Sequence, residues 1–147
     1  MAQGEFEHEL EKCASVVESM LQEHAYKTYL TMAYLVYPDR LDLKGLVSET
    51  GEAYSFEAIY EFGKALAAHG TEVPPFLFVA AEAETGEGDP CVFVSGATPD
   101  GRRNSMHIVL QRSRWRRILR PTGMVWHDEA PELTSAGELM RGLLTGT

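Results

Sequence analysis

The stretch FLFVAAEAETGEGDPCVFVSGATPDGRRNSMHIVLQ, residues 76–111, decides the fold class. Its apolar segments are rich in Phe, Val and Ile, and they are separated by TGEGDP and TPDGRR, which are rich in Gly, Pro and Asp. Short aromatic and β-branched runs that alternate with such turn sequences are typical of an antiparallel meander. We therefore predict three consecutive strands, with Met106, Ile108 and Leu110 on one face of the third.

Helical patterns lie on both sides of this meander. In residues 5–24 and 56–69, apolar side chains recur every three or four positions, which places them on one side of a helix. Ser55 is suited to cap the start of the second helix. Residues 136–144 form a third amphipathic pattern, and Ser135 begins an S-x-x-E capping box in front of it.

The segment between the first two helices predicts two strands joined by a turn. Residues 28–37 are rich in Tyr, Thr, Leu and Val and stop at Pro38. After the turn, Leu41 and Leu43 alternate with polar residues, as in a half-buried strand. The alternative is a first helix that continues to Tyr37, because apolar residues on both sides of this segment also fit a buried helix.

The expected element order is α-β-β-α-β-β-β-(β)-α, in which the bracketed strand is GMVWH, residues 123–127. Runs of strands separated by helices favour an α+β fold with helices packed on an antiparallel sheet of about five or six strands. A length of 147 residues suits one hydrophobic core. We predict a single α+β domain over residues 1–147.

The N-terminal residues and the cysteines indicate a cytoplasmic protein without membrane association. The start, MAQGEFEHELEK, is acidic and lacks the basic region and apolar run of a signal peptide. The most apolar stretches are far shorter than the roughly 20 residues that cross a bilayer. Cys13 and Cys91 lie in apolar surroundings and predict free, buried thiols. The ligand spacings that we recognise for metals and nucleotides do not occur, so we expect no metal and no cofactor.

Positive charge is concentrated in residues 102–120, which hold seven of the thirteen basic residues and no acid, in a chain of formal net charge −9. In its densest part, QRSRWRRILRP, arginines surround Trp115. A third strand that continued unchanged would next present Arg112, Arg114 and Arg116 on its apolar face. The chain must therefore turn, bulge or pass the edge of the sheet near residue 112.

This arginine cluster has three candidate functions. The candidate anion- or partner-binding residues are Arg112, Arg114, Trp115, Arg116 and Arg117. Nucleic acid is disfavoured, because the negative net charge opposes long-range attraction. An anionic small molecule needs only two or three converging arginines. We favour pairing with carboxylates of the protein itself or of another subunit.

The candidates for acid–base catalysis are His107, His127, Asp128 and Glu129, which offer imidazole and carboxylate groups. Adjacent residues of a strand point to opposite faces, so His127 and Asp128 cannot easily share one metal ion. A surface histidine beside an acidic approach to the last helix is the favoured interpretation. The catalytic residues therefore stay unassigned.

All six tyrosines fall within residues 26–60. Tyrosine is enriched at binding surfaces, but it is also common in strands for reasons of packing. Packing is the favoured interpretation; if exposed, Tyr29, Tyr34 and Tyr37 would mark an interface or an apolar cleft.

Taken together, these patterns predict a non-catalytic protein-binding or regulatory module that self-associates, most readily as a symmetric homodimer. The alternative is an enzyme or ligand-binding protein that holds an anionic small molecule. In that case the Arg112–Arg117 cluster would bind the anion, and His107 or His127 would transfer protons.

Overall fold

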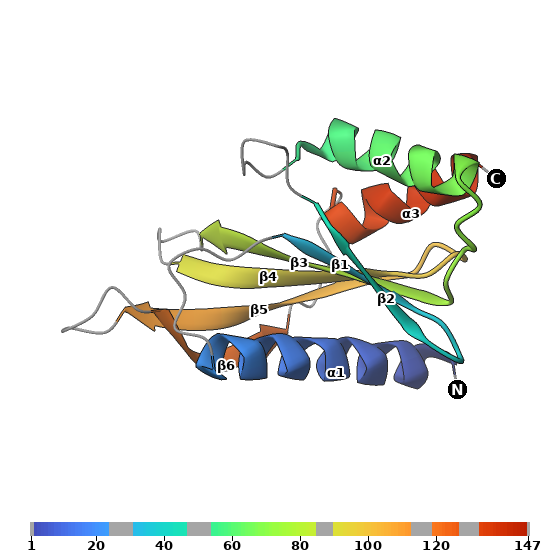
Figure 1. Cartoon of the computed structure of the whole chain (residues 1–147). Helices are drawn as coiled ribbons and strands as arrows, with labels where there is room; N and C mark the ends of the chain where they lie inside the picture. The colour runs from blue at the N-terminus through green and yellow to red at the C-terminus, as the bar shows by residue number, and fades with distance from the viewer. Residues whose placement is uncertain are drawn as a thin grey trace.

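The computed structural model describes residues 2–23, 31–46, 54–84, 90–112, 119–126 and 133–146. These residues form α1 (Ala2–Glu23), β1 (Met32–Val36), β2 (Leu41–Gly45), α2 (Phe56–Ala68), β3 (Phe76–Glu84), β4 (Pro90–Ala97), β5 (Arg103–Arg112), β6 (Leu119–Trp126) and α3 (Ser135–Thr145). The element order and the α+β class confirm the prediction (Figure 1).

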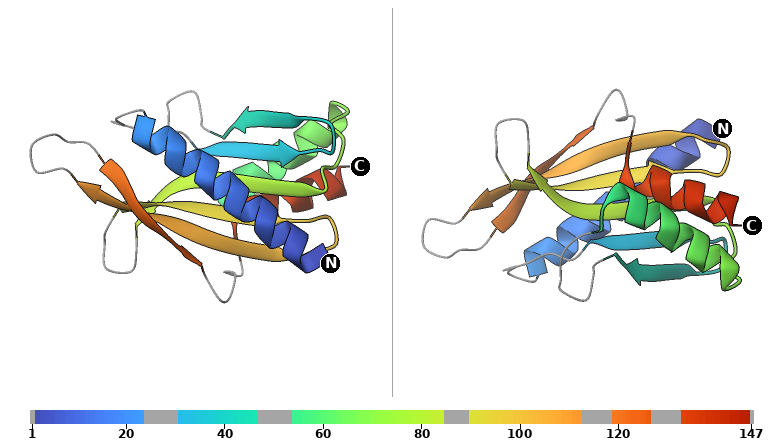
Figure 2. Two further views of the ribbon diagram at one scale, coloured as in Figure 1. Left: turned by 90° about the horizontal axis from the view of Figure 1, so that it is seen from below. Right: turned by 90° about the horizontal axis from the view of Figure 1, so that it is seen from above.

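The described strands form one antiparallel sheet in the order β2-β1-β3-β4-β5-β6. Helix α1 crosses one face of this sheet diagonally, whereas α2 and α3 lie side by side over the other face (Figure 2). The molecule therefore has a layer of one helix, a layer of strands and a layer of two helices.

The face under α1 is an apolar core built from alternate strand residues. Phe6, Leu10 and Val17 project from α1 onto Phe78 and Met106 of the sheet. The spacing of these helix residues places them on one side of α1, as the sequence pattern predicted. All five side chains are buried.

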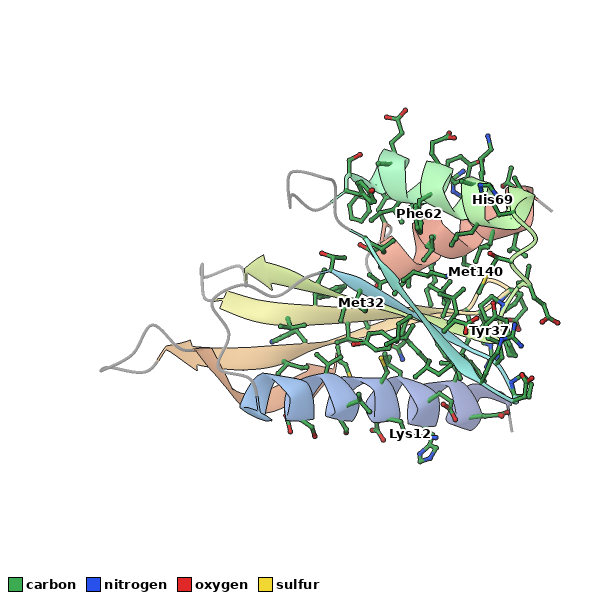
Figure 3. All side chains as sticks on the ribbon, in the orientation of Figure 1. Lys12, Met32, Tyr37, Phe62, His69 and Met140 are labelled. Carbon is green, nitrogen blue, oxygen red and sulfur yellow. The ribbon has the colours of Figure 1, made fainter. Side chains whose placement is uncertain are left out.

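On the opposite face, α2 and α3 approach each other closely at two glycines. A Cβ atom on Gly142 would lie 2.1 Å from the carbonyl oxygen of Tyr60, and one on Gly63 would lie 2.5 Å from that of Leu139. Only residues without a side chain fit there. The pair of helices buries a second apolar cluster against the sheet, which includes Met140 (Figure 3).

Residues 31–46 settle the choice between helix and strand. β1 and β2 form the predicted hairpin, so a first helix that continues to Tyr37 is wrong over residues 32–36. The apolar residues on both sides of β1 are explained by its position in the sheet, since Tyr34 joins the apolar cluster on the α1 face and Leu35 joins the cluster on the face of α2 and α3. Residues 24–30 lie outside the described part of the chain.

Both predicted helix starts can be compared with the structure. Ser55 caps α2, and its hydroxyl accepts a hydrogen bond from the backbone N–H of Ala58 at 3.2 Å, as predicted. For α3 the predicted cap was wrong by one residue. The cap is Thr134, whose backbone is extended and whose Oγ1 accepts from the N–H of Gly137 at 3.0 Å, whereas Ser135 already belongs to the helix.

The last strand also differs from its prediction. β6 begins at Leu119 rather than at residue 123, and its pairing with β5 shifts between Val109 and Leu110. This irregularity lies slightly before residue 112, near which a change of the chain was predicted. Met106 and Ile108 share one face of β5, as predicted, and that face packs under α1.

The two cysteines are free and buried, which confirms that prediction. Within the described ranges, no helix combines the length and the apolar character needed to cross a membrane.

Candidate partner-binding groove

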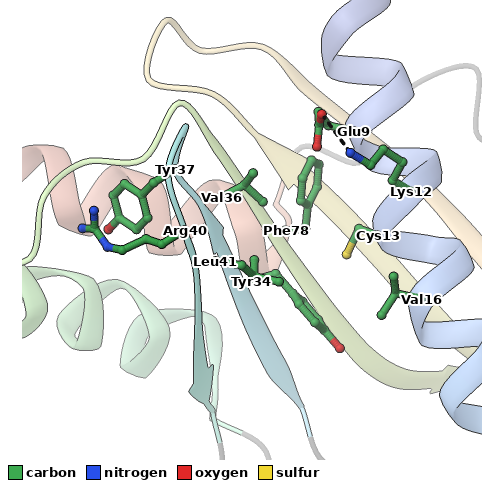
Figure 4. Close-up of a pocket in the computed structure, with 10 residues that line it drawn as sticks. All are labelled: Glu9, Lys12, Cys13, Val16, Tyr34, Val36, Tyr37, Arg40, Leu41 and Phe78. Atoms are coloured by element: carbon green, nitrogen blue, oxygen red, sulfur yellow. Dashed lines mark ion pairs between the residues drawn. The ribbon is translucent and has the colours of Figure 1, made fainter.

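Helix α1 covers only part of its face of the sheet. It packs on β3, β4, β5 and β6. A helix is about 10 Å wide, whereas six strands at about 4.8 Å spacing span more than twice that distance. One helix therefore leaves the β1–β2 side of this face open, and a groove runs between α1 and the hairpin (Figure 4).

The groove is mainly apolar and has a volume of about 270 Å³. Cys13 and Val16 line it from α1, and Val36 and Leu41 line it from the hairpin (Figure 4). Phe78 of the central strand β3 lies beneath it. The floor of the groove is thus a fully buried core residue, Phe78, whereas Val36 at its side is only partly buried.

Large apolar side chains gather at this groove. Val16 is 52% exposed and Leu41 is 53% exposed, on opposite sides of it. Leu43 is 54% exposed and shares their face, because it pairs with Tyr34 in the hairpin. Single exposed apolar residues are normal, but a group of them beside a groove is typical of an interaction surface.

Each charged residue that lines the groove has an ion-pair partner. Lys12 lies 3.5 Å from the carboxylate of Glu9 on α1. On the hairpin, Arg40 stacks 3.9 Å above the ring of Tyr37 and pairs with nearby carboxylates. The hydroxyl of Tyr37 donates to the backbone oxygen of Glu72 at 2.6 Å. Among the described residues, neither rim therefore offers an unpaired charge for an ionic ligand.

The thiol of Cys13 behaves as an apolar group. Burial, with a smaller contribution from the carboxylate of Glu9, raises the pKa of Cys13 from its ordinary value of 9.0 to about 12. The thiol is therefore protonated at neutral pH. Since the thiolate is the nucleophilic form, this cysteine is suited to packing rather than to catalysis.

A second cavity, of about 290 Å³, lies between α3 and the turn from β4 to β5. Its lining includes Arg103, Glu138 and Arg141. Two nitrogens of Arg141 donate to one carboxylate oxygen of Glu138 at 3.1 and 2.6 Å, and its guanidinium lies 3.8 Å from the ring centre of Tyr60. Arg141 is therefore held by groups of the protein itself.

The structure brings some of the predicted site residues to the groove. Tyr34 and Tyr37 both line it, although their side chains are largely buried. Tyr29 lies outside the described residues. Sequence reasoning missed Val16 and Leu41 as groove residues, because their patterns also fit an ordinary helix and an ordinary half-buried strand.

The other predicted residues lie elsewhere. His107 is half-buried on the face of the sheet opposite Met106, so it is separated from the groove by the sheet. Arg112 is the last residue of β5. The remaining candidates fall outside the described residues: Arg114, Trp115, Arg116, Arg117, His127, Asp128 and Glu129. The described part of the chain groups no three His, Cys, Asp or Glu residues suitable for a metal ion.

Comparison with known proteins assigns no family: no family model, no curated protein and no solved structure matches the chain. The functional argument therefore depends on the groove and its surroundings.

Proposed function

We propose that this protein is a non-catalytic protein-binding module of the cytoplasm, which self-associates and holds an apolar segment of a partner in the groove beside α1. One observation carries the proposal. Val16 and Leu41 are exposed on opposite sides of a groove whose base is the core residue Phe78. A partner that covered these side chains would remove apolar surface from water, at about 25 cal/mol per Å².

The size and chemistry of the groove favour side chains of a protein over a small molecule. Its volume of about 270 Å³ is close to the lower limit of roughly 300 Å³ for small-molecule sites, which is room for one or two side chains. Its charged rim residues are already paired, so they add little to the recognition of an ionic ligand. One or two apolar anchor residues of a peptide suit such a site.

The protonated thiol of Cys13 supports binding rather than covalent catalysis. A catalytic cysteine needs a lowered pKa, which a neighbouring cation or a helix N-terminus provides. Cys13 has the opposite environment, because burial and Glu9 both raise its pKa.

An anion-binding function is the alternative, and the second cavity is the described feature that favours it. Arg103, from the basic stretch of residues 102–120, lines that cavity together with Arg141. Glu138 lies in the same cavity and already binds Arg141. A negatively charged ligand would have to compete with this carboxylate, so we place this function second.

Selection of a random peptide library against the purified protein tests the proposal. We expect enriched peptides to share apolar anchor residues and to bind with micromolar Kd. Val16→Lys places a charge at the groove without disturbing the core, and we expect it to weaken binding by about tenfold or more. The matched control is Leu133→Lys, at an apolar residue of nearly equal exposure outside the groove.

The proposal is supported if Val16→Lys lowers the affinity and Leu133→Lys does not. It is wrong if no peptide is enriched, or if the enriched peptides bind the Val16→Lys variant as well as the unchanged protein. Acidic or phosphorylated peptides that lose affinity in an Arg103→Glu variant, but not in Val16→Lys, would support the anion-binding alternative instead.

A further inference from the structure

Strand β2 is the outermost strand on one side of the sheet, and no described strand pairs with its outer edge (Figure 2). The hairpin bonds define which groups point outward. The N–H of Tyr37 donates to the oxygen of Arg40, and the N–H of Leu46 donates to that of Thr31, both at 2.9 Å. Because inward and outward groups alternate along a strand, Leu41, Leu43 and Gly45 direct their backbone N–H and C=O groups away from β1.

The geometry points to this edge as the place where a second copy of the chain binds, with the two β2 strands antiparallel about a two-fold axis at Leu43. This inference specifies the self-association that is part of the proposed function, and Leu41 is the one groove residue of β2 that it also involves. In this register, Leu43 faces Leu43 of the second copy, and Leu41 faces Gly45 of the second copy. All three outward-facing residues then exchange both of their backbone hydrogen bonds with the second copy.

The charges of β2 select this register. With Leu43 at the axis, Asp42 faces Lys44 of the second copy, and symmetry repeats the pair. These residues occupy non-hydrogen-bonded positions, where opposite side chains are closest. Moving the axis by one residue along the strand would instead place Asp42 against Asp42 or Lys44 against Lys44, and like charges there are destabilising.

Both charged side chains are available for this pairing. Lys44 forms no ion pair with any described residue. Asp42 lies 3.4 Å from Nε of Arg40, but Arg40 also contacts the carboxylates of Asp39 and Glu72. Arg40 therefore keeps two anionic partners when Asp42 turns toward the second copy.

The apolar residues and the opposite edge agree with this choice. Leu43 is about half exposed, and in this register it would pack beside Leu43 of the second copy. The other outermost strand, β6, contains Pro121, which lacks the N–H that strand addition requires. β2 contains no proline.

A charge exchange tests the register directly. We expect the unchanged protein to dimerise in the micromolar range by sedimentation equilibrium. Asp42→Lys and Lys44→Asp should each raise the dimer dissociation constant by about tenfold or more, since each creates two like-charge pairs. The double variant Asp42→Lys/Lys44→Asp restores both attractive pairs and should dimerise again. Glu11→Lys, an equal change of charge on the exposed side of α1, should have no effect.

An equimolar mixture of the two single variants adds a test that misfolding cannot imitate. Asp42→Lys and Lys44→Asp chains are complementary to each other, so native mass spectrometry with one chain labelled in ¹⁵N should show predominantly mixed dimers. The inference is overturned if the unchanged protein is monomeric throughout the micromolar range, if both single variants dimerise normally, or if the mixture forms no mixed dimer. Peptide binding at the groove, which Val16→Lys reports, would survive each of these results.

Discussion

The two faces of the sheet are covered in different ways, and the difference separates the part that stabilises the fold from the part suited to binding. On one face, α2 and α3 touch through Gly63 and Gly142 and act as a single broad cover. On the other face, α1 stands alone and leaves a groove beside the β1–β2 hairpin. A pair of helices can close a face of this width, whereas one helix cannot.

Truncating a buried side chain on the closed face, under α2 and α3, should cause the largest loss of folding stability. Leu139 is fully buried between α3 and the sheet, so Leu139→Ala should lower the free energy of unfolding by about 2–5 kcal/mol. The matched control is Leu144→Ala in the same helix, where the side chain is exposed and the loss should stay below about 1 kcal/mol. Urea unfolding followed by circular dichroism measures both, and equal losses would contradict the distinction.

Disrupting the close contact of α2 and α3 at Gly142 should cause the second largest loss of folding stability. A methyl group at Gly142 would lie 2.1 Å from the carbonyl oxygen of Tyr60, so Gly142→Ala forces α2 and α3 apart and should cost about 1–3 kcal/mol. Gly4 in α1 has open space at its Cβ position, and Gly4→Ala should stabilise by up to about 1 kcal/mol through helix propensity. Opposite signs for the two substitutions in thermal unfolding are expected. A Gly142→Ala protein as stable as the unchanged one would refute the close contact.

The third effect in size should be a pH-dependent loss of folding stability at Cys13, which lines the groove. Its pKa is about 12 when folded and near 9.0 when unfolded, so between these values the folded state binds more protons. Stability from this group is complete below about pH 9 and falls as the pH rises toward 12. By pH 10 the loss should be about 1 kcal/mol. Urea unfolding at pH 8 and pH 10 should show a smaller decrease for Cys13→Ala, and an identical decrease in both proteins would contradict the burial of the thiol.

The smallest effect on stability should occur at the rim of the groove. Val16 is half exposed on α1, so Val16→Lys should change the free energy of unfolding by no more than about 0.5 kcal/mol. The same substitution should abolish most peptide binding. A loss of several kcal/mol at this position would mean that Val16 belongs to the core rather than to a binding surface.

Local patterns predicted most of the fold. Residues 76–111 alternate apolar runs with turn sequences, and β3, β4 and β5 follow them closely. Ser55 marks the start of α2, because a side-chain oxygen next to the first turn satisfies a free N–H there. The cap of α3 was misplaced by one residue, since Thr134 and Ser135 have the same capping chemistry and only the backbone geometry distinguishes them.

The candidate site was much less predictable than the elements that build it. The arginine cluster attracted attention because charge is visible in composition, whereas the groove consists of ordinary apolar residues at ordinary spacings. Val16 lies in α1 and Leu41 in β2, and nothing in their separate patterns indicates that they face each other.

The sequence alone thus determined the order of the elements, the α+β class and the alternation of Asp42 and Lys44 about Leu43, because each depends on neighbouring residues. Only the tertiary structure decided that β2 lies at the edge of the sheet and that α1 stops short of it. Strand order and helix placement depend on contacts between residues far apart in the chain, and no local period encodes them.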